Sequence, residues 1–145
     1  QGEENLRAAL SKLETFQALD PPLRQKVEDI FLEIADEDTF GAGSILFKQG
    51  APGTDQGYIL VDGQVTIKKS NQDDIVVSAP QILGEMNQFN PVQCRTATVV
   101  AKDTLDLLSF QWSDFQGALE RQLPEKDRAQ VRKNLQDFAW KRFLQ

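Results

Sequence analysis

The chain has 145 residues, of which 40% are hydrophobic and 26% charged, and its formal net charge is -6 at pH 7. This length allows one domain with a real hydrophobic core, and the composition is that of an ordinary globular protein. The acidic balance argues against direct contact with nucleic acid, which normally requires a basic face. The sequence has no apolar run long enough to span a bilayer and no signal-peptide pattern, so we expect no membrane insertion.

The counts of cysteine, histidine and methionine exclude several classes of site. A single cysteine, Cys94, cannot form an internal disulfide, which fits a reducing compartment, and we expect a cytoplasmic protein. The absence of histidine excludes histidine-ligated metals and haem, and also Ser–His and Cys–His nucleophile pairs. We therefore expect no enzyme, no catalytic residue, no metal and no resident cofactor. Because Met86 is the only methionine, Gln1 is not a natural translation start, and we expect a longer parent protein.

The N-terminal part, residues 1–35, has the periodicity of helices. Leu6, Leu10 and Leu13 recur at i, i+4 and i+7, which places them on one face of a helix. Asp20-Pro21-Pro22 then predicts the start of another helix, with the aspartate as N-cap and proline in the first turn. The apolar stripe of this second helix consists of Leu23, Val27, Ile30, Phe31 and Ile34.

From residue 36 to residue 112 the pattern changes to short apolar runs separated by turn residues. The predicted strands occupy residues 44–48, 58–61, 64–68, 75–77 and 104–110. Asp62-Gly63 is a strong signal for a two-residue hairpin between the second and third of these strands. Many short strands with regular turns predict a sandwich or a barrel-like roll.

The last part, residues 113–145, returns to helical spacing. Ser113-Asp114 can cap a helix over residues 115–121, whose inward side chains are Phe115, Ala118 and Leu119. Pro124 opens a second helix that reaches Phe143. The apolar stripe of this final helix consists of Val131, Leu135, Phe138 and Ala139.

Residues 83–101, LGEMNQFNPVQCRTATVVA, contain the groups that indicate a binding site. Gly84 allows a ligand to approach the backbone closely, and amides at the start of a short helix carry a partial positive charge. Arg95 offers a planar fork that matches two phosphate oxygens. Glu85 would repel phosphate, so it needs another partner, and a sugar hydroxyl would suit it.

Gly84-Glu85-Met86 and, after a variable run, Arg95-Thr96-Ala97-Thr98 resemble the phosphate-binding cassette of the cyclic nucleotide-binding domain family. The eleven-residue step from Gly84 to Arg95 is similar to that of bacterial catabolite-activator-type domains. The resemblance covers about residues 16–144. It implies a mainly β fold with flanking helices in one domain, residues 1–145. The fold would be a jelly-roll-like double-stranded β-helix with N-terminal helices and two C-terminal helices.

The resemblance also implies a role for each ligand-binding residue. Arg95 would pair with the exocyclic oxygens of a cyclic phosphate, and Glu85 would accept a hydrogen bond from the ribose 2′-hydroxyl. Gly84 and the amides of Glu85 and Met86 would line the sugar-phosphate. Thr96 would add a hydroxyl and an amide to the phosphate.

The sequence departs from the family pattern at three places near these residues. Leu83 stands where an aromatic residue is usual, Asn87-Gln88 where small and apolar residues are preferred, and Cys94 where proline is common. None of these departures removes a group that the resemblance assigns to the ligand.

The first functional hypothesis is a non-enzymatic regulatory domain that binds a 3′,5′-cyclic mononucleotide, with cAMP favoured over cGMP. Binding would be relayed through the C-terminal helix to an effector domain in the parent chain. The alternative is a ligand-free β-roll that serves as a protein docking or homodimerisation domain, which Leu83 and Asn87-Gln88 favour. A third hypothesis, a cupin-like metal enzyme, is opposed by the absence of histidine.

Overall fold

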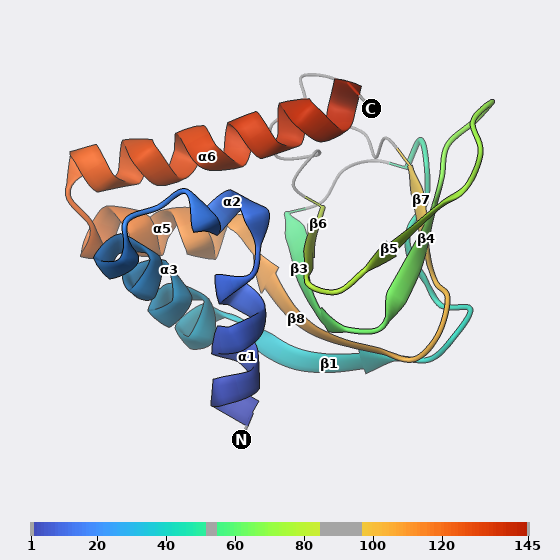
Figure 1. Ribbon diagram of the computed structural model, residues 1–145, viewed down its shortest axis with the longest axis horizontal. Coiled ribbons are helices and arrows are strands. Elements are labelled where there is room, and N and C mark those ends of the chain that lie inside the picture. The colour runs from blue at the N-terminus through green and yellow to red at the C-terminus, as the bar shows by residue number, and fades with distance from the viewer. Residues whose placement is uncertain (1, 52–54, 85–96, 145) are drawn as a thin grey trace.

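The computed structural model describes residues 2–51, 55–84 and 97–144, and Figure 1 shows the helices on one side of a roll of β-strands. The helices are α1 Gly2–Ser11, α2 Glu14–Gln17, α3 Pro21–Ile34, α5 Trp112–Gln122 and α6 Glu125–Leu144. The strands are β1 Asp36–Phe40, β2 Ile45–Phe47, β3 Gln56–Asp62, β4 Gln64–Lys68, β5 Ile75–Ser78, β6 Gln81–Leu83, β7 Thr98–Ala101 and β8 Leu105–Gln111. Among these described helices, none is both long and apolar enough to cross a membrane.

Two four-stranded sheets form the roll. The first sheet has the strand order β1-β8-β3-β6 and the second has the order β2-β7-β4-β5. Neighbouring strands run antiparallel in both sheets. The chain passes from one sheet to the other several times, as Figure 1 shows. The prediction of a mainly β fold, a jelly-roll-like double-stranded β-helix with flanking helices, is confirmed.

The first sheet separates two hydrophobic cores. We call the one against the helices the helical core, and it contains Leu10, Leu13, Phe16, Leu19, Leu23, Val27, Ile30, Phe31, Ile59, Ile82, Leu108, Phe110, Trp112, Phe115, Ala118, Leu119, Leu123, Val131 and Leu135. We call the one inside the roll the roll core, and it contains Leu60, Val65, Leu83, Val99, Ala101, Leu105 and Leu107. Successive side chains of a strand point to opposite faces, so Ile59 and Leu60 on β3 enter different cores. Because β8 is covered on both faces, its consecutive residues Leu107 and Leu108 are both buried, in different cores.

Phe31 on α3 lies at the centre of the helical core. Its ring stacks on Phe115 of α5 at 4.7 Å and meets Phe110 of β8 edge-on at 5.1 Å, measured between ring centroids. The predicted start of α3 is confirmed, because the helix begins at Pro21 and the Asp20 carbonyl accepts a hydrogen bond from the Arg24 amide at 2.8 Å. Within the described part of the chain, the Asp20 side chain itself makes no capping hydrogen bond.

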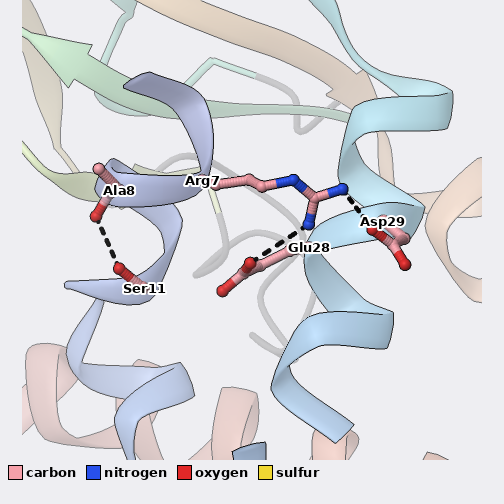
Figure 2. Close-up of polar contacts among 5 residues, drawn as sticks. All are labelled: Arg7, Ala8, Ser11, Glu28 and Asp29. Atoms are coloured by element: carbon pink, nitrogen blue, oxygen red, sulfur yellow. Dashed lines mark hydrogen bonds and ion pairs between the residues drawn. The ribbon is translucent and has the colours of Figure 1, made fainter. Parts of the chain in front are cut away.

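Helix α1 is held to α3 by polar contacts as well as by apolar packing. Figure 2 shows Arg7 reaching from α1 to two carboxylates on α3: Glu28 at 3.5 Å and Asp29 at 2.6 Å. Glu28 is buried, with 8% of the residue exposed, which makes its charge dependent on a partner. The helix ends at Ser11, two residues before the last leucine of the predicted face, so Leu13 enters the core from the connection to α2.

The hairpin predicted at Asp62-Gly63 is wrong. Strand β3 pairs with β6 and β8, whereas β4 pairs with β5 and β7, so the turn is a corner between the two sheets. Gly63 has φ of +104°, and a Cβ there would lie 2.6 Å from the Thr104 carbonyl oxygen. The Gln64 amide also donates to the Asp103 carboxylate at 2.8 Å. These contacts with residues 103–104 fix a corner at which the chain leaves the first sheet, so β4 does not pair with β3.

The predicted cap at Ser113-Asp114 is also wrong. Helix α5 begins at Trp112, three residues before the predicted start at Phe115, and its cap comes from a residue that is distant in sequence. The Asp55 carboxylate accepts hydrogen bonds from the Ser113 amide at 3.0 and 3.2 Å and from the Ser113 hydroxyl. The Asp55 carbonyl accepts another from the Trp112 amide at 2.8 Å. Asp55 thus fixes the start of β3 to the first turn of α5.

Candidate ligand-binding site

The predicted binding segment lies in the sequence between a strand of the first sheet and a strand of the second. It leaves the first sheet after β6, which ends at Leu83, and joins the second sheet at Thr98, where β7 begins. Of the residues predicted to bind the ligand, Gly84 is described, and Glu85, Met86, Arg95 and Thr96 lie outside the described residues. The structure therefore defines the two strand ends that flank the predicted ligand-binding residues in the sequence. We call these two strand ends the frame of the site.

Gly84 has the backbone conformation that requires glycine. Its φ is +97°, which side-chain-bearing residues rarely adopt. The strand before it is fixed by backbone pairing, since Leu83 lies opposite Tyr58 of β3. The chain therefore turns sharply at Gly84, directly after a buried leucine. The sequence predicts glycine here for the close approach of a ligand, and the structure adds a second reason, a backbone conformation that favours glycine.

The C-terminal end of the segment is fixed by burial and by a side-chain hydrogen bond. Ala97 is buried, and Val99 and Ala101 follow it into the roll core. The Thr98 hydroxyl oxygen accepts a hydrogen bond from the Gln49 amide at 2.9 Å. Sequence reasoning missed Gln49, whose only local signal was a polar residue before Gly50 in a turn-rich stretch.

The roll interior also presents partly buried apolar side chains beside its fully buried ones. Phe40, Leu46, Phe47, Tyr58, Ile67, Val77 and Ala79 pack against the roll core in this way. The Tyr58 ring lies 5.9 Å from the Phe40 ring and 5.4 Å from the Phe47 ring, measured between centroids. Such a wall suits the apolar faces of a planar ring. Within the described residues, no cluster of three or more His, Cys, Asp or Glu side chains could hold a metal ion.

Helix α6 packs against the helical core and extends toward the roll. Val131 and Leu135 are buried in the helical core, and Arg132 donates to Gln116 of α5 at 3.2 Å. In Figure 1 the helix continues past this core, and its C-terminal end extends toward the roll on the side where β6 ends. The side chains of Phe138 and Ala139, predicted for its apolar stripe, lie outside the described residues.

Comparison with a protein-family model identifies the kind of domain that the roll forms. The model of the cyclic nucleotide-binding domain matches residues 37–122, from β1 to the end of α5. The chain belongs to the cyclic nucleotide-binding domain family. The resemblance found at residues 84–98 is thus confirmed by the whole roll and not by the segment alone. Domains of this family are regulatory modules rather than catalytic ones.

A curated relative places a domain of this family within a longer protein. The Pycsar effector protein RsmPycTIR from Rhodovulum sp. (strain MB263) is 31% identical to the chain over 116 residues. The match covers 78% of this chain and 43% of the relative, so the chain spans less than half of that protein's length.

Solved structures share the fold along nearly the whole chain. The N-terminal domain of a transcriptional regulator from Streptomyces coelicolor A3(2) is 27% identical, with a TM-score of 0.64. That match covers 94% of this chain and 91% of the other. The regulatory domain of Toxoplasma gondii PKA, solved with cAMP, is 21% identical with a TM-score of 0.65. It covers 93% of this chain and 50% of the other, and at this identity it shows the fold.

Proposed function

We propose that this cyclic nucleotide-binding domain binds a 3′,5′-cyclic mononucleotide between β6 and β7 and acts as a sensor. The observation that carries this proposal is the frame of the site within a family-matched roll: Gly84, with φ of +97°, directly follows β6, and the buried Ala97 directly precedes β7. Between them lies a segment in which Arg95 supplies a phosphate partner and Glu85 a ribose partner.

The proposed roles follow from the chemistry of the ligand. A cyclic phosphate carries one negative charge on two exocyclic oxygens, which matches the two-pronged guanidinium of Arg95. Glu85 accepts the ribose 2′-hydroxyl, and Gly84 with the amides of Glu85 and Met86 lines the sugar-phosphate. Thr96 adds a hydroxyl and an amide. The partly buried wall around Tyr58 and Phe47 supplies apolar surface for the base.

For the base, we propose cAMP over cGMP. The solved regulatory domain from Toxoplasma gondii contains cAMP in a roll of the same fold, which supports the proposal at the level of the fold. Among the described residues, the proposal assigns the base apolar surface and no specific hydrogen bond. A titration with all four 3′,5′-cyclic nucleotides is therefore the direct measurement of preference.

We further propose that binding is relayed through α6 to an effector domain in the parent chain. Ile82 on β6 and Val131 and Leu135 on α6 belong to the same helical core. A change in the chain at Gly84 can therefore reach α6 through packed side chains, and the ligand shifts the population of α6 positions. The greater length of the relative RsmPycTIR supports the presence of a further domain.

Isothermal titration with cAMP, cGMP, cCMP and cUMP tests the proposal, with Arg95→Ala as the diagnostic variant. Removing one partner of a desolvated charge pair costs about 2–5 kcal/mol, or roughly thirty- to several-thousandfold in affinity. Arg121→Ala, which removes an exposed arginine on α5, is the matched control and should bind as the wild type. Equal binding by the Arg95 variant would refute the proposed site.

Glu85→Ala tests the ribose contact separately from the phosphate contact. We expect a loss of about 1–3 kcal/mol, as for a hydrogen bond that leaves a polar group without its partner. The preference for the ribonucleotide over its 2′-deoxy form should fall with it. Unchanged discrimination between the two sugars would remove Glu85 from the site.

One observation favours the second candidate function, a ligand-free docking or dimerisation domain. Ile75 and Val76 on β5 are about half exposed, and β5 is an edge strand of the second sheet. Exposed apolar edge strands are surfaces on which other chains can pair. A domain that binds none of the four nucleotides, and whose oligomeric state ignores them in light scattering, would favour this alternative.

A further inference from the structure

Three segments of the second sheet meet in a polar contact beside the start of β7. The backbone amide of Gln49 donates to the Thr98 hydroxyl oxygen at 2.9 Å. The side-chain Oε1 of Gln49 accepts from the Ser70 amide at 3.0 Å and from the Ser70 hydroxyl at 3.2 Å. Gln49 therefore joins the loop after β2, the first residue of β7 and the loop between β4 and β5.

A tight turn leaves the Gln49 amide free to make its bond to Thr98. The Ala51 amide donates to the Lys48 carbonyl at 3.1 Å, and Gly50 has φ of +83°. These features match a type II turn, in which Gly50 occupies the third position. The turn's own hydrogen bond joins its first and fourth residues. The N–H of Gln49, at the second position, is thus available to an outside acceptor.

The β4–β5 loop presents Ser70 to Gln49 through a tight turn of the same kind. The Gln72 amide donates to the Lys69 carbonyl at 3.3 Å, and Asn71 at the third position has φ of +63°. Asparagine adopts this left-handed conformation more readily than most residues. Ser70 occupies the second position, so its amide also points away from the turn bond. Each turn therefore leaves its second residue free to bond across the gap between the loops.

The contact holds Thr98 on the β2 side, where the backbone pairing with β7 does not include this residue. The last backbone pair between β2 and β7 is Phe47 with Val99, after an irregularity between Ile45 and Phe47. The Gln49 amide adds one contact nearer to the start of β7. On the other side, Lys68 of β4 lies opposite Thr98. Thr98 is therefore held from both neighbouring segments.

We propose that Gln49 is a positioning residue for the ligand site, because it holds Thr98 and hence the C-terminal end of the 84–97 segment. This inference rests on the proposed nucleotide-binding function and deepens it. Arg95 is three residues from Thr98 in the sequence, so a fully extended chain separates their Cα atoms by at most about 11 Å. A less constrained Thr98 increases the range of positions open to Arg95, and restricting that range opposes binding.

The expected size of the effect is modest, because the groups involved are not deeply buried. Gln49 and Ser70 are exposed and Thr98 is half-buried. The net contribution of one hydrogen bond then corresponds to about a two- to tenfold change in affinity. The test must therefore separate a small loss of affinity from a general loss of stability.

Two matched pairs of variants isolate the contact. Thr98→Val removes the acceptor while keeping the shape of the side chain, and Thr98→Ser restores the hydroxyl. Thr66→Val makes the same change on the neighbouring strand β4. Gln49→Met removes the side-chain acceptor. Gln64→Met is its control, because it also removes a side-chain hydrogen bond of a glutamine, but one away from Thr98. The side-chain Nε2 of Gln64 donates to the Ser78 hydroxyl at 2.9 Å in the β4–β5 pair.

Isothermal titration with cAMP and with cGMP should show a two- to tenfold loss in Thr98→Val and Gln49→Met, within the range estimated for one hydrogen bond. Thr98→Ser should recover wild-type affinity, and the Thr66 and Gln64 variants should bind as the wild type. Without ligand, Thr98→Val should melt slightly below Thr66→Val, because only Thr98→Val loses the hydrogen bond from the Gln49 amide. Wild-type affinity in Thr98→Val and Gln49→Met, or an equal loss in the two controls, would overturn the positioning role.

Hydrogen exchange without nucleotide distinguishes this inference from the proposed function. The Gln49 amide should exchange more slowly in the wild type than in Thr98→Val, because only the wild type has an acceptor for it. Equal exchange together with intact wild-type binding would overturn the positioning role alone. A protected amide in a wild-type protein that binds none of the four 3′,5′-cyclic nucleotides would overturn the proposed function, and the positioning role with it.

Discussion

Ile82 and Leu83 are consecutive residues of β6 that lie in different hydrophobic cores. Ile82 is fully buried in the helical core, and Leu83 is 2% exposed in the roll core. Gly84 follows directly and begins the predicted binding segment. A shift of the chain at this glycine therefore acts on both cores at once. This placement is the structural basis for the proposed relay from ligand to α6.

Truncating either neighbour should separate stability from binding. Ile82→Ala and Leu83→Ala should each lower the free energy of unfolding by about 2–5 kcal/mol, since both remove fully packed side chains. Only Leu83→Ala changes the wall of the roll beside Gly84, so it should weaken nucleotide binding more. Urea unfolding and titration of the folded fraction measure the two effects. Ile82→Val is the control, with an expected cost of about 0.5–1.5 kcal/mol. Equal affinities for the two alanine variants would contradict the prediction.

Gly57 on β3 should not tolerate a side chain. An added Cβ would lie 2.7 Å from the Phe110 ring and 2.8 Å from Nε1 of Trp112, both in the helical core. Overpacking of this kind typically costs about 1–3 kcal/mol, so Gly57→Ala should lower the melting temperature. Gly41→Ala is the matched control, because no described atom lies within 4 Å of a Cβ there. If thermal unfolding gave the same midpoint for both variants, the close approach at Gly57 would not be rigid.

Features set by local periodicity were predictable from the sequence. The stripe of Leu23, Val27, Ile30 and Phe31 is buried on α3, and the runs at residues 64–68 and 75–77 are strands. These assignments depend on contacts that repeat every two, three or four residues, which is the range a pattern can report. Gly84 was singled out instead by its place in the Gly84-Glu85-Met86 motif, and its positive φ is a finding of the structure.

Features that depend on distant contacts were not predictable in the same way. Asp62-Gly63 has the sequence of a hairpin, but the partners of β3 and β4 lie in different sheets. The strand β1, Asp36–Phe40, carries three acidic residues and pairs as a sheet edge with β8. Charged edge strands are common because they discourage pairing with other chains, yet they lack the apolar alternation of a strand. Gln49 escaped notice because its hydrogen bonds join three segments that are distant in the sequence.

The Arg7–Glu28 pair should contribute to stability through the buried carboxylate. The Glu28 side chain is 11% exposed and that of Arg7 is 33% exposed, so solvent screens the pair only in part. Arg7→Met should cost about 1–3 kcal/mol, because it leaves Glu28 buried without this partner. Arg7→Met with Glu28→Gln should recover part of that loss in urea unfolding. Lys133→Met is the control, because its pair with Asp137 is exposed on both sides and worth at most about 0.5 kcal/mol. Additive losses in the double variant would show that the two side chains act independently.

Asp55 should stabilise α5 although it lies 58 residues away from Ser113 in the sequence. Asp55→Ala removes the carboxylate that satisfies the Ser113 amide and hydroxyl at the first turn of the helix. Loss of a helix cap costs about 0.5–2 kcal/mol, and the negative charge also interacts favourably with the helix N-terminus. Asp55→Asn should recover the hydrogen bonds but not the charge, so its melting temperature should fall between those of the wild type and Asp55→Ala. Asp114→Ala, at the position that the sequence pattern favoured for capping, should have the smaller effect. A larger loss in Asp114→Ala than in Asp55→Ala would mean that the cap is local after all.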